Sequence, residues 1–447
     1  MSVYATVSEG IGGVIRAKPE DFLVEEVLVD GSVASIGGSL RKSALSASSA
    51  EQPFLLCVLV KRRWDTFAAI KAIAKQLGIG LERIHIAGIK DAKAITAQHI
   101  AIEGITADAV QKVCIKDIGL YSIGYFRDAL SSFYLLGNQF AITIRNIGLE
   151  ESSLKLRVAG IASELELQGG MPNFFGHQRF GTTRAITHLV GRAIVNGDFE
   201  RAALLFLANP SPFEHPDSRL ARETLQATHN FNEALKNFPR QLRFERLMLH
   251  HLVENKLDFV GAFQRLPLKL QLLFVQAYQA YLFNRFLSER LRLGFSLNVA
   301  EVGDFVVGVD RLDLPMPTMG RLVTAELRDG VNDSIKAGRL RVALPLVGFT
   351  QGLSYGEMGD LEERILRDED LKLAKFKIQQ LPRISCRGEL RSTVSPIRNF
   401  QIEEVRPDEE SAKTHLVKLN FRLLRGSYAT MFLRELMKPQ DPLGAGF

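Results

Sequence analysis

The sequence predicts a mixed α/β (α+β) fold in which a largely helical insertion divides an α/β body. Three observations support this prediction. Strand-like and helical segments alternate in the opening third of the 447-residue chain. From about Asp198, helical segments follow one another, separated by connections that contain Pro and Gly. Strand-like sequence then returns at 400–405 and 417–423, before a last helix at 429–438.

The elements of the body follow from periodicity and from capping residues. The apolar run at 55–59 predicts a strand. Asp65 or Thr66 can cap the next helix, whose apolar residues recur at helical spacing until Gly78 ends it. The other predicted elements of this part are strands at 84–89 and 140–147, a helix at 150–167 and a flexible Ser/Ala/Gly-rich surface loop at 32–50.

The insertion is expected to be mainly helical. Its predicted helices lie at 199–208, 219–238, 265–292 and 359–380. We therefore expect two domains: a discontinuous body, 1–197 with 386–447, and an inserted domain, 198–385.

The composition limits the classes of protein to consider. With 46% hydrophobic and 24% charged residues, the chain is compatible with a soluble globular protein and not with a disordered chain, a collagen or a coiled coil. A net charge of +6 favours a polyanionic partner only weakly. The three scattered cysteines form no zinc-site spacing, so we expect no metal. The chain shows neither a signal peptide nor an apolar run of about 18 residues, so we expect a cytoplasmic protein without a membrane segment.

The first segment that could carry chemistry is G-I-K-D at 88–91, at the end of a predicted strand. The glycine allows a tight turn, which would present the Asp91 carboxylate at a sheet edge. Strand alternation would place Asp91 on the face of His85 and opposite Lys90, so Lys90 need not be its partner. The alternative is a turn aspartate that accepts backbone N–H groups, with Thr96 capping the next element.

The second segment is M-P-N-F-F-G-H-Q-R-F-G at 171–181. Its aromatic rings could stack on unpaired bases, at about 1–3 kcal/mol per base, and the amides of Asn173 and Gln178 could recognise a base edge. Arg179 could hold a phosphate or pair with an acid. The alternative is a core plug, in which Phe174, Phe175 and Phe180 are buried and Gln178 only bonds backbone groups.

Two further segments lie near the ends of the chain. In R-A-K-P-E-D-F at 16–22, Pro19 forces an extended or turn entry, and Phe22 projects from a charged stretch. An edge strand whose charges face water would have the same pattern. In G-S-Y-A-T at 426–430, Ser427 could cap the last helix, or the exposed N–H groups there could hold a phosphate.

Basic residues gather in two parts of the sequence. Between positions 61 and 93, eight Lys or Arg stand against three acidic residues. A second group consists of Arg383, Arg387, Arg391 and Arg398. Such runs are usually solvated surface, but both groups along one cleft would attract phosphates.

These four segments, in this order, resemble the TruD family of tRNA pseudouridine synthases. The family shows segments of the type K-x-x-P-E-D-F, G-x-K-D-x-x-A-x-T-x-Q, N-x-F-G-x-Q-R-F-G and S-x-A-T-x-x-x-R-E-L. Here they read R-A-K-P-E-D-F (16–22), G-I-K-D-A-K-A-I-T-A-Q (88–98), N-F-F-G-H-Q-R-F-G (173–181) and S-Y-A-T-M-F-L-R-E-L (427–436). A fifth stretch, Q-A-Y-Q-A-Y-L-F-N (276–284), is similar to a helix of the family's inserted domain. The resemblance covers nearly the whole chain, whose length is closer to archaeal and eukaryotic members than to bacterial ones.

The resemblance implies a pseudouridine synthase fold: a mixed, mostly antiparallel sheet flanked by helices, with a TRUD insertion that forms the opposite wall of a cleft. Asp91 matches the family's catalytic aspartate, which favours the catalytic interpretation over the turn aspartate. Phe22 and Phe175 match rings that line the uridine pocket, and Asn173 matches a residue that contacts the active site. The family's basic position, often Lys in bacterial members, is Arg16 here, and a guanidinium can hold the Asp91 carboxylate ionised through two hydrogen bonds.

The implied activity is the isomerisation of uridine to pseudouridine, usually at position 13 of certain tRNAs. Asp91 could attack the uracil ring or C1′, or act around a glycal-like intermediate, and the sequence leaves these open. The uridine would leave its stack and enter between Phe22 and Phe175. We expect tRNA as partner and neither a cofactor nor a metal. The candidate RNA contacts are Lys18, Lys90, Lys93, Arg179, Arg391 and Ser427.

Two other classes of function remain as hypotheses. The chain could be an RNA-binding or RNA-refolding module that keeps the fold without the chemistry, although the presence of Asp91, Asn173 and Phe175 argues against it. It could also be a glycosidase-like hydrolase that pairs Asp91 with Glu20 or Asp21. Release of free uracil would indicate the hydrolase, and binding without product would indicate the module.

Overall fold

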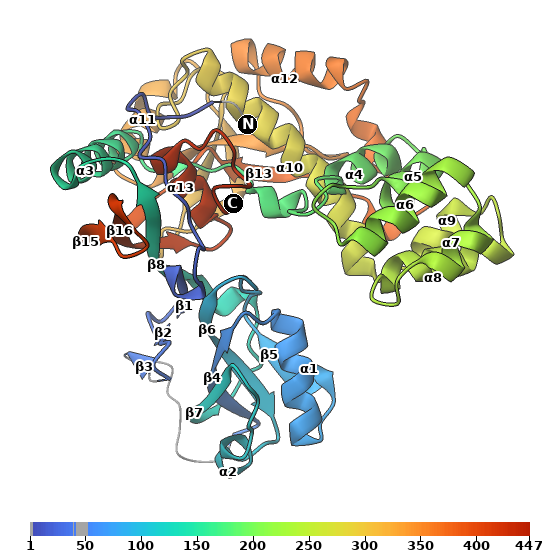
Figure 1. Cartoon of the computed structure of the whole chain (residues 1–447). Coiled ribbons are helices and arrows are strands. Elements are labelled where there is room, and N and C mark those ends of the chain that lie inside the picture. The colour runs from blue at the N-terminus through green and yellow to red at the C-terminus, as the bar shows by residue number, and fades with distance from the viewer. Residues whose placement is uncertain (1–2, 39, 42–51) are drawn as a thin grey trace. The chain divides into compact units, whose positions relative to one another are not determined.

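The structure, a computed structural model, describes residues 3–38, 40–41 and 52–447 (Figure 1). By packing, the chain forms two compact units. The sheet unit consists of Ala5–Met171 and Ser395–Phe447, and the helical unit consists of the described residues up to Tyr4 together with Pro172–Val394. The predicted domain limits, after 197 and after 385, both fall inside the helical unit. The division into two domains, 1–197 with 386–447 and 198–385, stays a prediction.

The sheet unit is built on a mixed sheet with the strand order β15-β16-β8-β1-β6-β4-β7. The bounds are Phe22–Leu28 for β1, Phe54–Arg62 for β4, Ile95–Glu103 for β6, Ile118–Phe126 for β7, Leu135–Ile147 for β8, Ile397–Asp408 for β15 and Ser411–Leu424 for β16. β1 and β6 run parallel, and the other neighbours along this order run antiparallel. The predicted mixed, mostly antiparallel sheet is therefore confirmed.

Three short strands pair with this sheet outside that order: Val33–Ala34 (β2) with β1, Leu40–Arg41 (β3) with β2, and Ile84–Ile86 (β5) with β6. β5 is shorter than the predicted strand at 84–89, because the chain leaves the sheet before residue 88. The loop predicted at 32–50 contains β2 and β3 in its first part, and its residues 39 and 42–50 lie outside the described residues.

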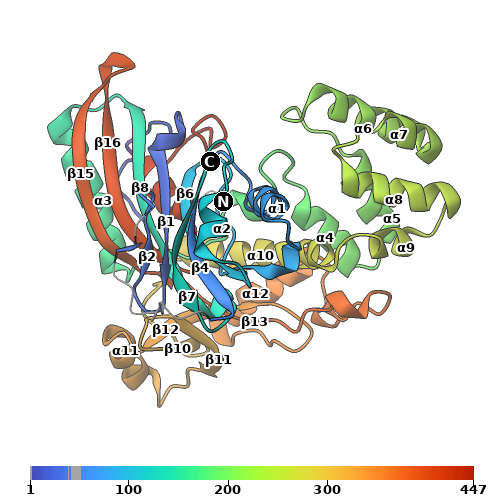
Figure 2. The same cartoon turned by 90° about the horizontal axis from the view of Figure 1, so that it is seen from below.

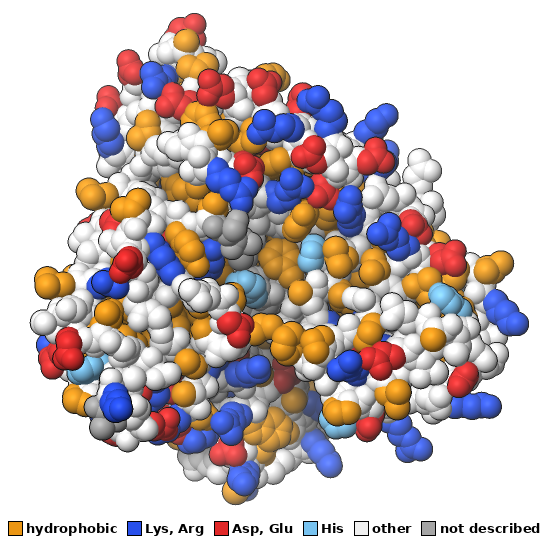
Figure 3. Space-filling view, turned by 45° about the horizontal axis from the view of Figure 1, so that its top comes forward, with side chains coloured by type: hydrophobic (Ala, Val, Ile, Leu, Met, Phe, Trp, Pro, Cys, Tyr) orange, Lys and Arg blue, Asp and Glu red, His pale blue; other side chains and the backbone are white. Residues whose placement is uncertain are grey.

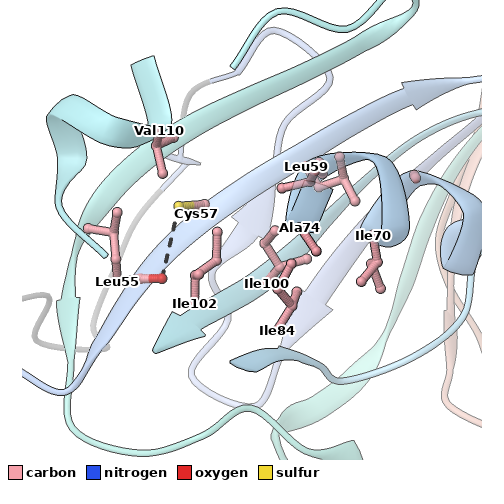
Figure 4. Close-up of a cluster of buried hydrophobic side chains, with 11 residues drawn as sticks. Leu55, Cys57, Leu59, Ile70, Ala74, Ile84, Ile100, Ile102 and Val110 are labelled. Carbon is pink, nitrogen blue, oxygen red and sulfur yellow. Dashed lines mark hydrogen bonds between the residues drawn. The ribbon is translucent and has the colours of Figure 1, made fainter. Parts of the chain in front are cut away.

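Helix α1 (Thr66–Leu77) begins and ends where the sequence predicts. The Asp65 carboxylate accepts the N–H groups of Phe67 at 2.9 Å and Ala68 at 3.0 Å, and Gly78 ends the helix with a φ of 67° in the left-handed region. One face of α1 packs on β4 and β6 (Figure 4). The buried side chains there include Leu55, Cys57, Leu59, Ile70, Ala74, Ile100 and Ile102. This core holds the strands that flank the 88–91 loop.

The other helices of the sheet unit are α2 (Ala107–Gln111), α3 (Glu151–Leu167) and α13 (Ala429–Met437). Figure 2 shows β15, β16, β8 and β1 side by side, with α3 next to the outer strand. α13 packs Phe432 on Phe421 of β16, with ring centroids 4.8 Å apart. The residue at the N-cap of α13 is Tyr428, so the possible capping role of Ser427 is not observed.

The helical unit is organised around α10 (Leu268–Arg292), which packs against α4 (Thr187–Val195). Its further helices are α5 (Phe199–Ala208), α6 (Pro216–Thr228), α7 (Phe231–Asn237), α8 (Arg243–Glu254), α9 (Phe259–Gln264), α11 (Arg328–Lys336) and α12 (Gly356–Asp368). The helix predicted at 219–238 is two helices, because His229 adopts a left-handed φ of 49° and ends α6. The helix predicted at 359–380 likewise ends early, just before Asp370, which has a φ of 49°.

The helical unit also contains an antiparallel sheet that the sequence did not predict. Its strand order is β11-β10-β12-β13, with bounds Pro315–Leu322 for β11, Phe305–Val309 for β10, Leu340–Leu346 for β12 and Glu389–Ser392 for β13. The chain passes between the two units within the short strands Met171–Pro172 (β9) and Val394–Ser395 (β14).

Two properties of the described residues bear on function. On the face seen in Figure 3, basic side chains are interspersed with acidic ones. No helix within 3–38, 40–41 and 52–447 combines the length and apolarity that crossing a membrane requires.

Candidate active site

Asp91 lies in the loop that joins β5 to β6. Gly88 lies close to other side chains, because a Cβ there would be 3.2 Å from Leu135 Cδ2 and 3.4 Å from Lys90 Nζ, and these atoms would have to shift slightly. One carboxylate oxygen of Asp91 accepts the N–H of Lys93 at 2.9 Å, as expected of a turn aspartate. The side chain nevertheless stays 28% exposed, so an oxygen can reach a second partner or a substrate.

That second partner is Arg16, which contacts Asp91 Oδ2 through Nη2 at 2.5 Å. The other terminal nitrogen of Arg16 donates to the Gly446 carbonyl at 2.8 Å, and its guanidinium lies 4.1 Å from the ring centroid of Phe22. Arg16 has a left-handed φ of 59°. An acceptor, an anion and a ring thus hold the Arg16 side chain in one orientation. We call Arg16, Phe22 and Asp91 the Asp91 cluster.

Phe22 has less free surface than a stacking platform would need. It is 3% exposed, with Arg16 next to its ring and the edge of Phe140 at a centroid distance of 6.4 Å. A base could contact the Phe22 ring broadly only if Arg16 moved. That Phe22 stacks on the uridine stays a prediction.

Lys90 is not placed to contact RNA in this structure. Its Nζ lies 2.6 Å from Glu26 Oε2 in the interior of the sheet unit, and Glu26 Oε1 also accepts the His99 N–H at 2.9 Å. Burial alone would raise the pKa of Glu26, but Lys90 and His99 outweigh it and lower this pKa. Lys90 therefore serves as the counter-ion of a buried carboxylate. Thr96 is buried within β6 and caps no element, contrary to the alternative considered for this segment.

Among the other candidate RNA contacts of the sheet unit, Lys93 is exposed, and Lys18 forms a surface ion pair with Glu410 at 2.8 Å. Such an exposed pair contributes little to stability and can exchange for a phosphate. Ser427 has its hydroxyl 2.6 Å from that of Ser395. Neither the Lys18–Glu410 ion pair nor the Ser427–Ser395 contact involves Asp91.

A second group of predicted residues lies in the helical unit and consists of Asn173, Phe175 and Arg391, which we call the Asn173 cluster. Arg391 donates to Asn173 Oδ1 at 2.6 Å and to its backbone carbonyl at 3.1 Å. The Asn173 amide nitrogen donates to the Ser392 carbonyl at 3.0 Å. The Arg391 guanidinium also lies 4.1 Å from the Phe175 ring centroid. The amide of Asn173 is thereby engaged at both its oxygen and its nitrogen.

The Asn173 cluster is fastened to α10 through the stretch 276–284, the fifth that resembles the family. Asn284 accepts the Phe175 N–H at 2.9 Å and donates to the Phe175 carbonyl at 3.0 Å, and Arg179 donates to Gln276 at 3.2 Å. Phe175 is 8% exposed, and Phe174 is also buried. The core-plug interpretation thus describes these two rings, and base stacking by Phe175 stays a prediction.

The sequence interpretation missed three side chains around the Asp91 loop: Glu26, Lys61 and Thr66. All three are buried. Lys61 stood out only as the first member of a basic run, and Thr66 only as a possible helix cap. In the described part of the chain, no group of three or more His, Cys, Asp or Glu is arranged to hold a metal ion.

Comparison with known proteins identifies the family. The family model of tRNA pseudouridine synthase D (TruD) matches residues 1–436. A Methanosarcina acetivorans protein named "Probable tRNA pseudouridine synthase D" is 38% identical over 444 residues, covering 99% of this chain and 96% of its own length. One of the same name from Methanococcoides burtonii is 36% identical, covering 98% and 96%. A crystal structure described as TruD from Methanosarcina mazei matches with a TM-score of 0.82 at 36% identity, over 99% of this chain and 97% of that one. The chain therefore belongs to the TruD family of tRNA pseudouridine synthases.

Proposed function

We propose that this protein isomerises uridine to pseudouridine at position 13 of tRNA, with Asp91 as its catalytic residue. The observation that carries the proposal is the partly exposed Asp91 carboxylate, oriented by Arg16 at 2.5 Å and by the Lys93 N–H at 2.9 Å. A carboxylate held in this way has a fixed direction and one face open to a substrate.

The proposed reaction breaks the bond between N1 of uracil and C1′, turns the base and joins C5 to C1′. The proton lost from C5 is balanced by the proton gained at N1, so there is no net redox change and the reaction requires no cofactor. Asp91 supplies the nucleophile, at the uracil ring or at C1′, or the proton-transfer group of a glycal-like path. Arg16 supplies a fixed positive charge and sets the orientation of Asp91.

The substrate proposed is tRNA, as the names of the related proteins say of them. Exposed Lys93 and the exchangeable ion pair of Lys18 support phosphate contacts on the sheet unit. A flipped uridine between Phe22 and Phe175 would need residues from both units, so each ring is proposed as a contact separately. A tRNA substrate also leads us to propose a cytoplasmic protein.

The paired-carboxylate hydrolase is less well supported. Asp21 is buried and pairs with Arg145 at 2.9 Å, which in turn contacts Asp408 at 3.2 Å. Glu20 pairs with Arg62 at 2.5 Å on the surface. Neither carboxylate shares a contact with Asp91 that would make it a second catalytic acid.

The test is a modification assay on unmodified tRNA transcripts, with pseudouridine mapped by carbodiimide treatment and primer extension. Wild type should give a stop at position 13. Asp91→Asn should lose about 10³-fold or more in rate, since it removes the proposed catalytic group, while transcript binding in a filter assay stays unchanged. The matched control is Asp329→Asn, an exposed carboxylate in α11, which should retain wild-type activity.

Two results would overturn the proposal. If wild type binds the transcripts tightly but modifies none, the RNA-binding module is the better function. If wild type releases free uracil, the chain is a hydrolase. A stop at another position would keep the reaction and overturn only the choice of uridine 13.

A further inference from the structure

Two buried side chains that the proposed reaction does not use converge on the backbone that carries Asp91. Lys61, near the end of β4, donates through Nζ to the carbonyl of Asp91 at 2.8 Å. The same nitrogen donates to the Trp64 carbonyl at 2.8 Å and lies 3.5 Å from the Lys90 carbonyl. A lysine ammonium has three hydrogens to donate, so these three carbonyls match its capacity.

Thr66, the first residue of α1, bonds the backbone of Lys90, the residue that precedes Asp91. Its hydroxyl accepts the Lys90 N–H at 3.1 Å, and its own hydrogen can be donated to the Lys90 carbonyl at 3.3 Å or to Gln98 Oε1 at 3.5 Å. Gln98 in β6 donates in turn to the Gly88 carbonyl at 3.0 Å. Three elements thus bond the backbone of 88–91, which lies outside the strand ladder.

These bonds hold the backbone at Asp91, whereas Arg16 holds its side chain. Arg16 contacts the carboxylate, whereas Lys61 contacts the backbone carbonyl of the same residue. The direction of a side chain depends on the orientation of its peptide, and a displacement of about 1 Å can reduce a rate by about 10²-fold. With only the carboxylate held, rotation of the backbone at Lys90 and Asp91 would swing the side chain of Asp91.

Lys61 makes this contact although the contact requires its charged side chain to be buried. Its side chain is fully buried, and the hydrogen-bond acceptors around its Nζ are carbonyls. Burial lowers the pKa of Lys61 to about 8; the nearby carboxylates of Asp91 and Asp65 oppose this shift, and Lys90 adds to it. An apolar side chain at this position would avoid that penalty but would leave the carbonyls of Trp64 and Asp91 without this donor.

We propose that Lys61 and Thr66 are positioning residues, which fix the backbone of Lys90 and Asp91 so that the Asp91 carboxylate points at the substrate; this rests on the proposed function of Asp91. The pair touches neither substrate nor the reacting atoms. Its effect on the reaction passes through Asp91.

The experiment compares Lys61→Met and Thr66→Val with Thr66→Ser, which keeps the hydroxyl. The matched control is Lys155→Met, an exposed lysine of α3. We expect Lys61→Met and Thr66→Val to lower single-turnover kcat about 10- to 100-fold with KM for tRNA within about twofold, and Thr66→Ser to stay within about threefold of wild type. Amide hydrogen exchange should accelerate at residues 88–93 and stay unchanged in β4 and β6.

The outcomes separate this inference from the proposed function. Wild-type kcat in a folded Lys61→Met and Thr66→Val would overturn the positioning role. Faster exchange throughout the sheet unit would also overturn it, since that result indicates a general structural role; if Lys61→Met does not fold, Thr66→Val decides. A wild-type protein without pseudouridine activity would instead overturn the proposed function, and would do so before any variant is compared.

Discussion

The Asp91 cluster and the Asn173 cluster both combine an arginine, a phenylalanine ring and a side-chain oxygen, but they differ in the group that carries this oxygen. In each, an arginine guanidinium lies 4.1 Å from a phenylalanine ring centroid and bonds the side-chain oxygen of a nearby residue. In the sheet unit that oxygen belongs to a carboxylate with 28% of its side chain exposed. In the helical unit it belongs to an amide that is 6% exposed and bonded at both ends.

The two clusters therefore differ in how accessible their central polar group is. The carboxylate of Asp91 is partly exposed next to a cation, whereas the buried amide of Asn173 already bonds its neighbours through both its oxygen and its nitrogen. The sheet unit accordingly places charged groups in its interior around Asp91, including Glu26, Lys90 and Lys61. Four predictions test this contrast.

The largest expected effect concerns the buried pair of Glu26 and Lys90. Glu26→Gln leaves the Lys90 ammonium in the interior without its anion, and should lower the free energy of unfolding by about 3–5 kcal/mol. Adding Lys90→Met should recover part of this loss, because it removes the unpaired charge. Denaturant unfolding measures both, with Glu403→Gln, from an exposed pair with Lys418, as the control. If Glu26→Gln lowers the free energy of unfolding no more than Glu403→Gln does, the buried pair does not contribute more to stability than an exposed one.

The second prediction is a pH dependence that originates from Lys61. Its pKa is lowered to about 8 from 10.5, so between these values the unfolded chain binds more protons than the folded one. The free energy of unfolding should therefore rise with pH from 8 to 10.5, by up to about 3 kcal/mol from this group. The measurement is the difference between wild type and Lys61→Met across that window. Parallel curves for the two proteins would show that Lys61 keeps an ordinary pKa.

The third prediction concerns the arginine of the Asp91 cluster. Arg16→Met keeps an unbranched apolar chain near Phe22 but removes the cation, and should reduce kcat by about 30-fold, equivalent to about 2 kcal/mol. Arg16→Lys can still reach the carboxylate and should lose much less. Single-turnover kinetics at saturating tRNA gives both values. Equal losses in the two variants would mean that guanidinium geometry, and not charge, is what Asp91 requires.

The smallest effect is expected from giving the Asn173 cluster a carboxylate. Asn173→Asp keeps the acceptor for Arg391. It replaces the amide nitrogen, which donates to the Ser392 carbonyl in wild type, by an oxygen that cannot donate. The protein should lose about 1–2 kcal/mol of stability, with kcat reduced less than by Arg16→Met. Thermal unfolding compared with Asn232→Asp, an exposed residue of α7, measures the loss. A gain of stability would show that Arg391 prefers an anion, and the two clusters would then be equivalent.

Much of the fold was predictable because its signals are local. Asp65 and Gly78 delimit α1 through hydrogen bonds and a φ value within a few residues of the helix itself. Residue pattern identified α5, α10 and the strands β4, β5, β8, β15 and β16 in the same way, whereas β1, β6 and β7 were not predicted. The sheet of β10, β11, β12 and β13 escaped prediction, since β13 pairs with a strand more than 40 residues earlier, and short strands are recognisable mainly by such partners.

The sequence by itself determined the family and the identity of the candidate catalytic residue, because the order of motifs and the type of each residue are properties of the sequence alone. Only the tertiary structure decided which groups surround that residue. Arg16 reaches Asp91 across 75 positions, and Arg391 reaches Asn173 across 218. The tertiary structure also paired Lys90 with Glu26, and it brought Lys61 and Thr66 to the backbone of Asp91 and Lys90. Burial and hydrogen-bond partners depend on how distant segments pack, and no local pattern of residues specifies that packing.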